Sequence, residues 1–354
     1  MDRIPALPPR DHPHLEFLFD YLGFFAKTAT IVVAVLIILS AVTTAAAQRA
    51  MRGPPMGHIQ VIRLNELLHD MRRAIEDAGL PRSAAKKQRK RDAKARKKQK
   101  HDEARRRVFV LSFEGDMAAS GVDSLRREIS AVLGTAKDED EVLVRVDSAG
   151  GMVHGYGLAA SQLARIRGKG VTLTVAVDKI AASGGYMMAA VADRILAAPF
   201  AVVGSIGVVA QIPNVHRLLK KHDVDVEVLT AGRYKRTLDV LGENTDEGRE
   251  KLRDELHDVH ALFQEFIGNY RPGLDLETVS TGEAWFGQRA LDRSLVDELV
   301  TSDEYLAAAC DEADILEVTW VQPKKPIERL FGQTTLAVGK LIDRLVDRTM
   351  GGLR

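Results

Sequence analysis

The chain has 354 residues, of which 45% are hydrophobic and 28% are charged, and its formal net charge is +1. This composition allows one sizeable folded domain with attached segments. The single cysteine, Cys310, excludes an internal disulfide and a cysteine-rich metal site.

Residues 28–47 form an uncharged run of 20 positions. As a helix this run is about 30 Å long, which matches the apolar core of a bilayer. The small residues at 45–47 also resemble the cleavage site of a signal peptide. However, the 27 residues before the run include four acids, unlike the short basic leader of a signal peptide. We therefore expect a short N-terminal segment at 1–27 and a retained transmembrane helix at 28–47; flanking Lys and Arg are too balanced to orient it.

Residues 48–107 are predicted to connect the membrane segment to the folded domain. Apolar residues at helical spacing predict an amphipathic helix over 61–80. Between 82 and 107 there are 14 lysines and arginines and three acids, so this block carries +11. No aromatic side chains alternate with these charges to stack on bases, so we expect a solvated spacer and no nucleic-acid binding. Contact with anionic lipid headgroups is the alternative function for this block.

From residue 108 the pattern changes to short apolar runs alternating with amphipathic helical stretches. Strands are predicted near 108–115, 141–148 and 171–179, and helices at 155–167 and 246–270. This alternation predicts an α/β domain with buried, largely parallel strands over 108–320. Residues 195–213 are also uncharged, but prolines and glycines interrupt them, which favours short strands over a second membrane span. Residues 321–354 form a C-terminal amphipathic segment, which we expect to cover a protomer contact or the membrane surface.

Three glycine-bearing loops, at 147–153, 181–186 and 204–207, follow predicted strands. A serine between a strand and a helix lies at the helix N-terminus, where free backbone N–H groups gather. The glycines after it allow a substrate backbone to approach closely. A Ser-Gly pair on its own is weak evidence, because most such pairs are simple turns.

The order of these loops is more specific than any one of them. DSAGG and AASGGY, each after a strand and before a helix, are followed by GSIG and then by GRYKR. With VDKIAASGGYMMA, YKRTLDVLGENT and TGEAWFGQRAL, the chain resembles the signal peptide peptidase A family of serine peptidases, in its SohB-type inner-membrane branch. The resemblance covers nearly the whole chain and implies a crotonase-like (Clp protease-like) domain behind an N-terminal membrane segment.

The resemblance assigns each role to a residue of this chain. It implies that Ser183 is the nucleophile, that Lys235 is the general base and that Ser205 supports the lysine. It places the oxyanion-hole donors at the N–H groups of Gly151 and Gly184. The chain departs from the family pattern at two positions, Ala149 in place of proline and Ser294 in place of glycine. The first removes the fixed φ angle that proline would give the oxyanion-hole loop.

The chemistry of such a pair is consistent with these residues. A serine hydroxyl attacks only when a neighbouring base removes its proton, and a lysine amine is a base only when desolvation keeps it neutral. His154 offers the alternative of a conventional triad with Ser183. No His, Cys and Asp residues have metal-ligand spacing, so we expect no metal and no cofactor.

We therefore expect a serine endopeptidase that acts on signal peptide remnants or small membrane-associated polypeptides. Its expected partners are peptide substrates, membrane lipid and further copies of itself. The resemblance implies a single-pass protein of a bacterial inner membrane with a periplasmic catalytic domain, although the basic block favours the opposite side. Two alternatives stay open: a non-catalytic membrane scaffold, and an acyl-CoA enzyme with the same fold.

Overall fold

The structure, a computed structural model, describes residues 24–25, 27–30, 32–34, 57–79, 81 and 105–322. Among those residues, no helix combines the length and the apolar character needed to cross a bilayer. Most of the membrane helix expected at 28–47, most of the basic block and nearly all of the C-terminal segment lie outside the described part; residues 28–30 and 32–34 of the expected span are described and are helical. One compact unit extends from His58 to Val321.

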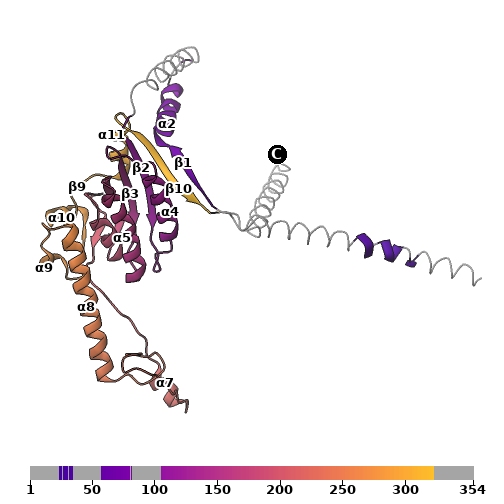
Figure 1. Cartoon of the computed structure of the whole chain (residues 1–354), viewed down its shortest axis with the longest axis vertical. Helices are drawn as coiled ribbons and strands as arrows, with labels where there is room; N and C mark the ends of the chain where they lie inside the picture. Colours follow the sequence, from indigo (N-terminus) through magenta and orange to yellow (C-terminus); the bar gives the residue numbers. More distant parts are fainter. Residues whose placement is uncertain are drawn as a thin grey trace, which may run out of the picture. The chain divides into compact units, whose positions relative to one another are not determined.

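The compact unit contains one large sheet and one small sheet (Figure 1). The seven strands of the large sheet, in spatial order, are β1 (His58–Arg63), β10 (Asp314–Val321), β2 (Arg107–Glu114), β3 (Glu141–Asp147), β4 (Thr172–Val177), β6 (Arg194–Ala197) and β9 (Glu298–Leu299). The three strands of the small sheet are β5 (Ile180–Ala182), β7 (Val202–Gly204) and β8 (Ala284–Phe286). The described helices are α2 (Leu64–Ala78), α4 (Val122–Leu133), α5 (Val153–Gly168), α6 (Gly184–Ala190), α7 (His216–Lys221), α8 (Asp246–Tyr270), α9 (Leu276–Val279), α10 (Gly287–Asp292) and α11 (Ser302–Ala309).

The large sheet is parallel from β10 to β9, and only the edge strand β1 runs antiparallel to its neighbour. The prediction of an α/β domain with largely parallel strands is thus confirmed. The strands are apolar on both faces because both faces are covered. Along β2, Leu111 belongs to the core shared with α4 and α5, whereas Val110 belongs to the core shared with α2 and α11.

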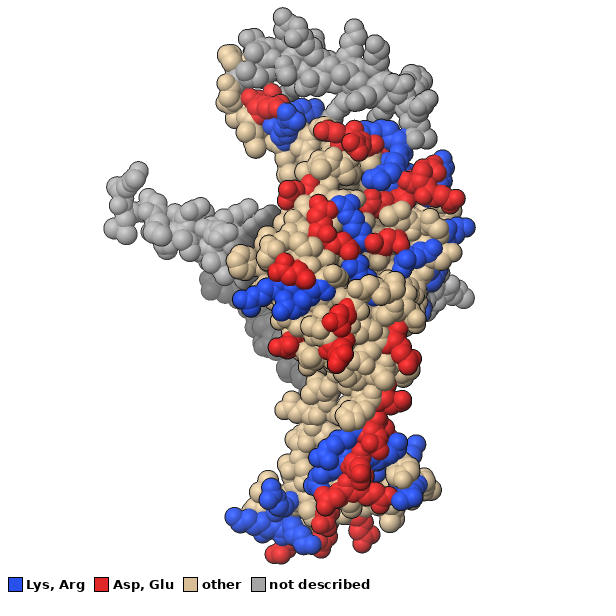
Figure 2. All heavy atoms as spheres, turned by 90° about the vertical axis from the view of Figure 1, so that its left-hand side faces the viewer, with Lys and Arg blue, Asp and Glu red and all other residues tan. Residues whose placement is uncertain are grey.

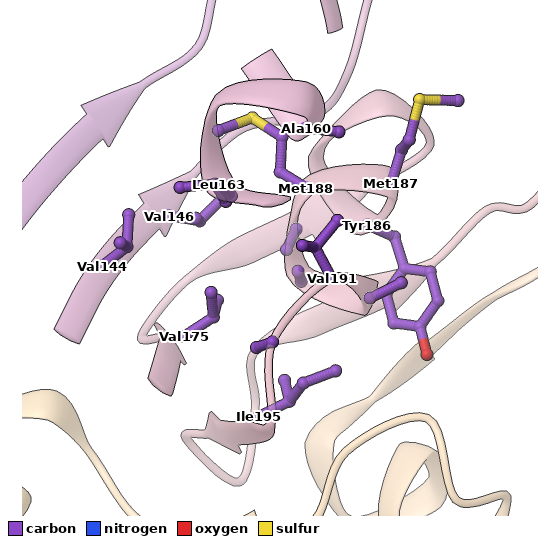
Figure 3. Close-up of a cluster of buried hydrophobic side chains, with 14 of the residues drawn as sticks. Val144, Val146, Ala160, Leu163, Val175, Tyr186, Met187, Met188, Val191 and Ile195 are labelled. Carbon is purple, nitrogen blue, oxygen red and sulfur yellow. The ribbon is translucent and has the colours of Figure 1, made fainter. Parts of the chain in front are cut away.

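Figure 3 shows part of the first core, where side chains of β3, β4 and β6 meet those of α5 and α6. Val146, Leu163 and Met188 are among its fully or almost fully buried members. This packing fixes α6 against the large sheet. Since α6 directly follows the second glycine-bearing loop, the core also fixes the position of that loop.

The small sheet forms at the carboxyl end of the large one. Strands β6 and β7 occupy the uncharged stretch at 195–213, as the prediction of short strands required. Strand β5 was not predicted separately because only Asp178 and Lys179 divide it from β4. It pairs in parallel with β7, and Ser148 after β3 joins it through an isolated bridge to Ala181. The three predicted loops therefore meet at one edge.

Helix α8 is predicted correctly at both ends and extends away from the sheets to the neighbourhood of α7 (Figure 1). Only its C-terminal half is fixed to the core, through the buried Phe263 and Ile267. Just after the helix, Arg271 donates two 2.8 Å hydrogen bonds to Asp297, whose carboxylate also accepts the N–H of Ile195 at 2.7 Å. This cluster joins α8 to β6.

A substitution of Asp297 tests how much this cluster contributes to the stability of the fold. Burial alone would raise the pKa of Asp297, but the hydrogen bonds from Arg271 and Ile195 outweigh it and hold the pKa below its ordinary value. A carboxyl with a lowered folded-state pKa stabilises the fold above its unfolded pKa, and this contribution is lost as the pH falls through the folded value. We expect Asp297→Asn to lower the free energy of unfolding at pH 7 by about 2 kcal/mol, with the difference from wild type shrinking below about pH 4.

Denaturant unfolding at several pH values measures this effect. Asp303→Asn serves as the control, because Asp303 meets Arg145 at 3.4 Å with 92% of its side chain exposed. An exposed ion pair contributes little to the free energy of unfolding. If both variants lost the same free energy of unfolding at pH 7, the stabilising role of the Asp297 cluster would be contradicted.

Candidate active site

Ser183 lies between β5 and α6, in a backbone conformation that is rare for a residue with a side chain. Its φ is 52° and its ψ is −118°, a region that favours glycine. Its N–H donates to the carbonyl of Gly204 at 2.8 Å, and its own carbonyl accepts the N–H of Met187 at 2.9 Å. The half-buried side chain of Ser183 thus stands at the N-terminus of α6, held by hydrogen bonds on both sides.

Ser205 follows β7 as Ser183 follows β5. The two strands are parallel, with Ala182 opposite Gly204, so both serines directly follow paired residues. Neighbouring strands lie about 4.8 Å apart, which makes the two serines neighbours. Ser205 also has a positive φ, of 53°, and its N–H donates to the carbonyl of Glu283 at 2.6 Å. The structure therefore brings these two predicted residues together.

The loop after β3 contacts Ser183 from the other side. The N–H of Ser148 donates to the carbonyl of Ile180 at 2.8 Å, and the carbonyl of Ser148 accepts the N–H of Ala182 at 3.0 Å. Gly150 has a φ of +88°, and a Cβ built there would lie 2.7 Å from both the Ser183 Cβ and the Gly184 nitrogen. Because no side chain fits in this space, the loop requires glycine at position 150.

The two predicted oxyanion donors lie in these segments. Gly151 is in the loop after β3 and is half-buried, while Gly184 is the buried first residue of α6. Within the described part of the chain, neither N–H donates a hydrogen bond. A backbone N–H must be unoccupied to bind a developing oxyanion, and both groups meet this requirement.

Lys235 lies apart from these residues. It is exposed, and its N–H closes a turn on the carbonyl of Gly232 at 3.1 Å. The ion pair of Arg233 with Glu247 at 2.7 Å joins this turn to the first turn of α8. From Glu247 to Phe263, where α8 reaches the core, the helix rises about 24 Å. Within the described residues no hydrogen bond connects Lys235 with Ser183.

The turn that carries Lys235 is highly charged. Figure 2 shows basic and acidic side chains crowded at this end of the compact unit. Besides the Arg233 pair, Arg249 pairs with Asp246 at 2.8 Å. Lys235 is therefore solvated here, and in this conformation it lacks the apolar surroundings that a neutral amine needs.

The alternative base, His154, is exposed in the first turn of α5. Among the described residues it makes no hydrogen bond, either to Ser183 or to an aspartate that would orient the imidazole. The conformation therefore offers no contact in support of a triad. No group of three or more His, Cys, Asp or Glu side chains within the described ranges is placed to hold a metal ion.

Two residues near the site, Ser148 and Tyr156, are not predicted by the sequence pattern. The Ser148 hydroxyl accepts the N–H of Gly150 at 3.1 Å and lies 2.6 Å from the hydroxyl of Tyr156. Ser148 belongs to the DSAGG loop and Tyr156 to the helix after it, but the pattern of apolar residues shows only that Tyr156 faces the core. No feature of the local sequence predicts that its hydroxyl reaches the loop.

Comparison with known proteins identifies the family. The description "Peptidase family S49 N-terminal" matches residues 16–163, and "Peptidase family S49" matches residues 165–316. A probable protease SohB of Haemophilus influenzae is 49% identical over 331 residues, covering 90% of this chain and 93% of the relative. A probable protease SohB of Buchnera aphidicola subsp. Acyrthosiphon pisum is 54% identical over 231 residues, covering 65% and 69%.

Among solved structures, a mutant of the 1510-N membrane-bound stomatin-specific protease matches with 13% identity and a TM-score of 0.40, covering 63% of this chain and 100% of that chain. The family matches and the relatives together span most of the sequence. The chain therefore belongs to peptidase family S49, among its SohB-type members, and is a serine-type peptidase.

Proposed function

We propose that the protein is a membrane-anchored endopeptidase that cleaves peptide bonds with Ser183 as nucleophile and Lys235 as general base. The observation that carries this proposal is the placement of Ser183. Its strained backbone presents the hydroxyl at a helix N-terminus, between a glycine loop and Ser205. Strain of this kind persists where the surrounding structure enforces it, and it is typical of functional sites.

The groups around Ser183 suit acyl transfer. When the hydroxyl attacks a peptide carbonyl, negative charge develops on the carbonyl oxygen, and donors aimed at that oxygen lower the barrier. In the proposed mechanism the N–H groups of Gly151 and Gly184 are these donors. Ser205, one strand away, supports the lysine amine without a carboxylate that would favour its charged form.

In this proposal the base comes from another copy of the chain. A general base must lie within hydrogen-bond reach of the proton that it removes, and Lys235 of the same chain is held at the first turn of α8. The segment around α7 and α8 also exposes large apolar side chains, among them Val209 at 91%, Leu229 at 91% and Leu262 at 57%. We infer that these side chains pack on a neighbouring protomer in a homo-oligomer, which carries Lys235 into its neighbour's site and removes water from the amine.

The membrane setting of the proposal rests on sequence. The uncharged run at 28–47 supports a single span of a bacterial inner membrane, with membrane lipid as a further partner. Family likeness supports the crotonase-like architecture, a periplasmic catalytic domain, and signal peptide remnants or small membrane-associated polypeptides as substrates. Protease accessibility of the carboxyl terminus in sealed vesicles tests the orientation.

Labelling with a fluorophosphonate probe tests the chemistry directly. The probe reacts with an activated serine, so Ser183 of the assembled protein should be labelled, and peptide mapping should locate the adduct. A non-catalytic scaffold, or an acyl-CoA enzyme that uses no nucleophilic serine, would leave Ser183 unmodified.

The strained backbone at Ser183 predicts that Ser183→Gly loses activity but is more stable than Ser183→Ala. Ser183→Gly relieves a backbone that costs about 1–3 kcal/mol, while Ser183→Ala keeps it. We expect both variants to lose peptide cleavage and the glycine variant to melt at a higher temperature than the alanine variant. A higher melting temperature for Ser183→Ala would show that the backbone is not strained.

The shared site predicts complementation between inactive variants. Ser183→Ala and Lys235→Ala should each be inactive, whereas Lys169→Ala, which alters an exposed lysine directly after α5, should retain activity. After subunits exchange in a one-to-one mixture of the two inactive variants, about a quarter of the interfaces pair an intact serine with an intact lysine.

Activity in the mixture should therefore recover to about a quarter of the wild-type value. The double variant Ser183→Ala/Lys235→Ala, mixed with either single variant, should give no recovery. Exchange without recovery, together with an active monomer on sizing, would refute the shared site and leave the role of Ser183 standing.

A further inference from the structure

A chain of hydrogen bonds runs from the glycine loop into the core. The N–H of Gly150 donates to the Ser148 hydroxyl at 3.1 Å, which lies 2.6 Å from the Tyr156 hydroxyl. The Tyr156 hydroxyl donates to the carbonyl of Asp116 at 2.8 Å. Because the phenol has one proton and gives it to Asp116, the Ser148 hydroxyl must donate to Tyr156. All the bonds in this chain therefore point in one direction, and each hydroxyl both accepts and donates.

The ring of Tyr156 also contacts the segment that carries the nucleophile. A Cβ built on Gly184 would lie 2.3 Å from the Tyr156 Cγ, so the first residue of α6 lies directly against the ring. At the hydroxyl end of the tyrosine, Gly115 lies against its partner Ser148, since a Cβ built on Gly115 would lie 2.1 Å from the Ser148 oxygen. Tyr156 is thus enclosed, with 0% of its surface exposed.

The surroundings keep the phenol protonated. Burial raises the pKa of the Tyr156 hydroxyl, and the hydrogen bond from Ser148 offsets this only in part. The proton needed for the bond to Asp116 is therefore retained over the working range of a peptidase.

We propose that Tyr156, acting with Ser148, is a positioning residue that sets the two oxyanion donors at their working separation. Through its hydroxyl it holds the loop that carries the N–H of Gly151, and through its ring it holds Gly184. Neither residue touches the reacting atoms. This inference rests on the proposed function, because it assumes that these two N–H groups receive the oxyanion.

Tyr156→Phe is the test, since it keeps the ring and removes the hydroxyl together with its hydrogen bonds to Ser148 and Asp116. Donors that bind charge only in the transition state affect turnover rather than substrate affinity. We expect kcat for a peptide substrate to fall about 10- to 100-fold while KM changes less than about twofold. The rate of Ser183 labelling by a fluorophosphonate should fall in parallel, because the probe's phosphoryl oxygen uses the same donors.

Tyr186→Phe is the matched control. Tyr186 is also fully buried, and its hydroxyl donates to the carbonyl of Leu295 at 2.9 Å, which does not belong to the loop. Figure 3 shows this hydroxyl directed away from Met187 and Met188. Tyr156→Phe loses two hydrogen bonds and Tyr186→Phe loses one, so the melting temperature should fall in both variants and more in Tyr156→Phe, while only Tyr156→Phe should lose kcat.

Ser148→Ala provides a second variant if Tyr156→Phe folds poorly, because it leaves the tyrosine in place and deprives Gly150 of its acceptor. The same loss of kcat supports the proposal. Equal kcat values for Tyr156→Phe and Tyr186→Phe, or a normal kcat in Ser148→Ala, would overturn it. Failure of the proposed function has a separate signature, which is full activity in Ser183→Ala.

Discussion

The parallel pairing of β5 with β7 is the interaction on which the candidate site depends. With Ala182 opposite Gly204, Ser183 and Ser205 emerge side by side, and the bond from the Ser183 N–H to Gly204 continues the ladder past the strand end. The bridge from Ser148 to Ala181 adds the glycine loop to the same edge. A shift of one residue in either pairing would reverse the direction of the side chains and separate Ser183 from its neighbours.

The rest of the compact unit supports this edge. The large sheet is buried on both faces, and the core shared with α5 and α6 fixes the N-terminus of α6, which directly follows Ser183. The cost of the strained φ at Ser183 is small beside the stabilisation from a core of this size. The local conformation is therefore set by packing and strand pairing rather than by the preference of serine.

The position of Lys235 has a consequence for regulation. If the base comes from a neighbouring copy, an isolated chain holds a serine without a base, and its lysine stays exposed to solvent. Assembly then both completes the site and desolvates the amine. Such a peptidase becomes active only where its concentration allows oligomers to form, for example after anchoring confines it to a membrane.

The sequence alone determined the class of the domain and most of its long elements. Apolar runs over β2 to β4 predicted buried parallel strands, and the charged stretch over α8 predicted a helix with the observed bounds. The serine loops were recognisable because paired glycines at a strand end are typical of a tight turn or a close backbone approach. Ser294 is informative too: it replaces the glycine of the family pattern and has a φ of 60°, which accounts for the usual glycine at that position.

Only the tertiary structure decided how these parts meet. Strand β1 pairs with β10 more than 250 residues away, and no local pattern predicts that pairing. The bond between Ser148 and Tyr156 and the distance of Lys235 from Ser183 likewise depend on how whole elements pack. Local sequence sets backbone preference and the apolar face of each element. Contacts between distant segments depend on the register and burial of the complete fold, which no single segment contains.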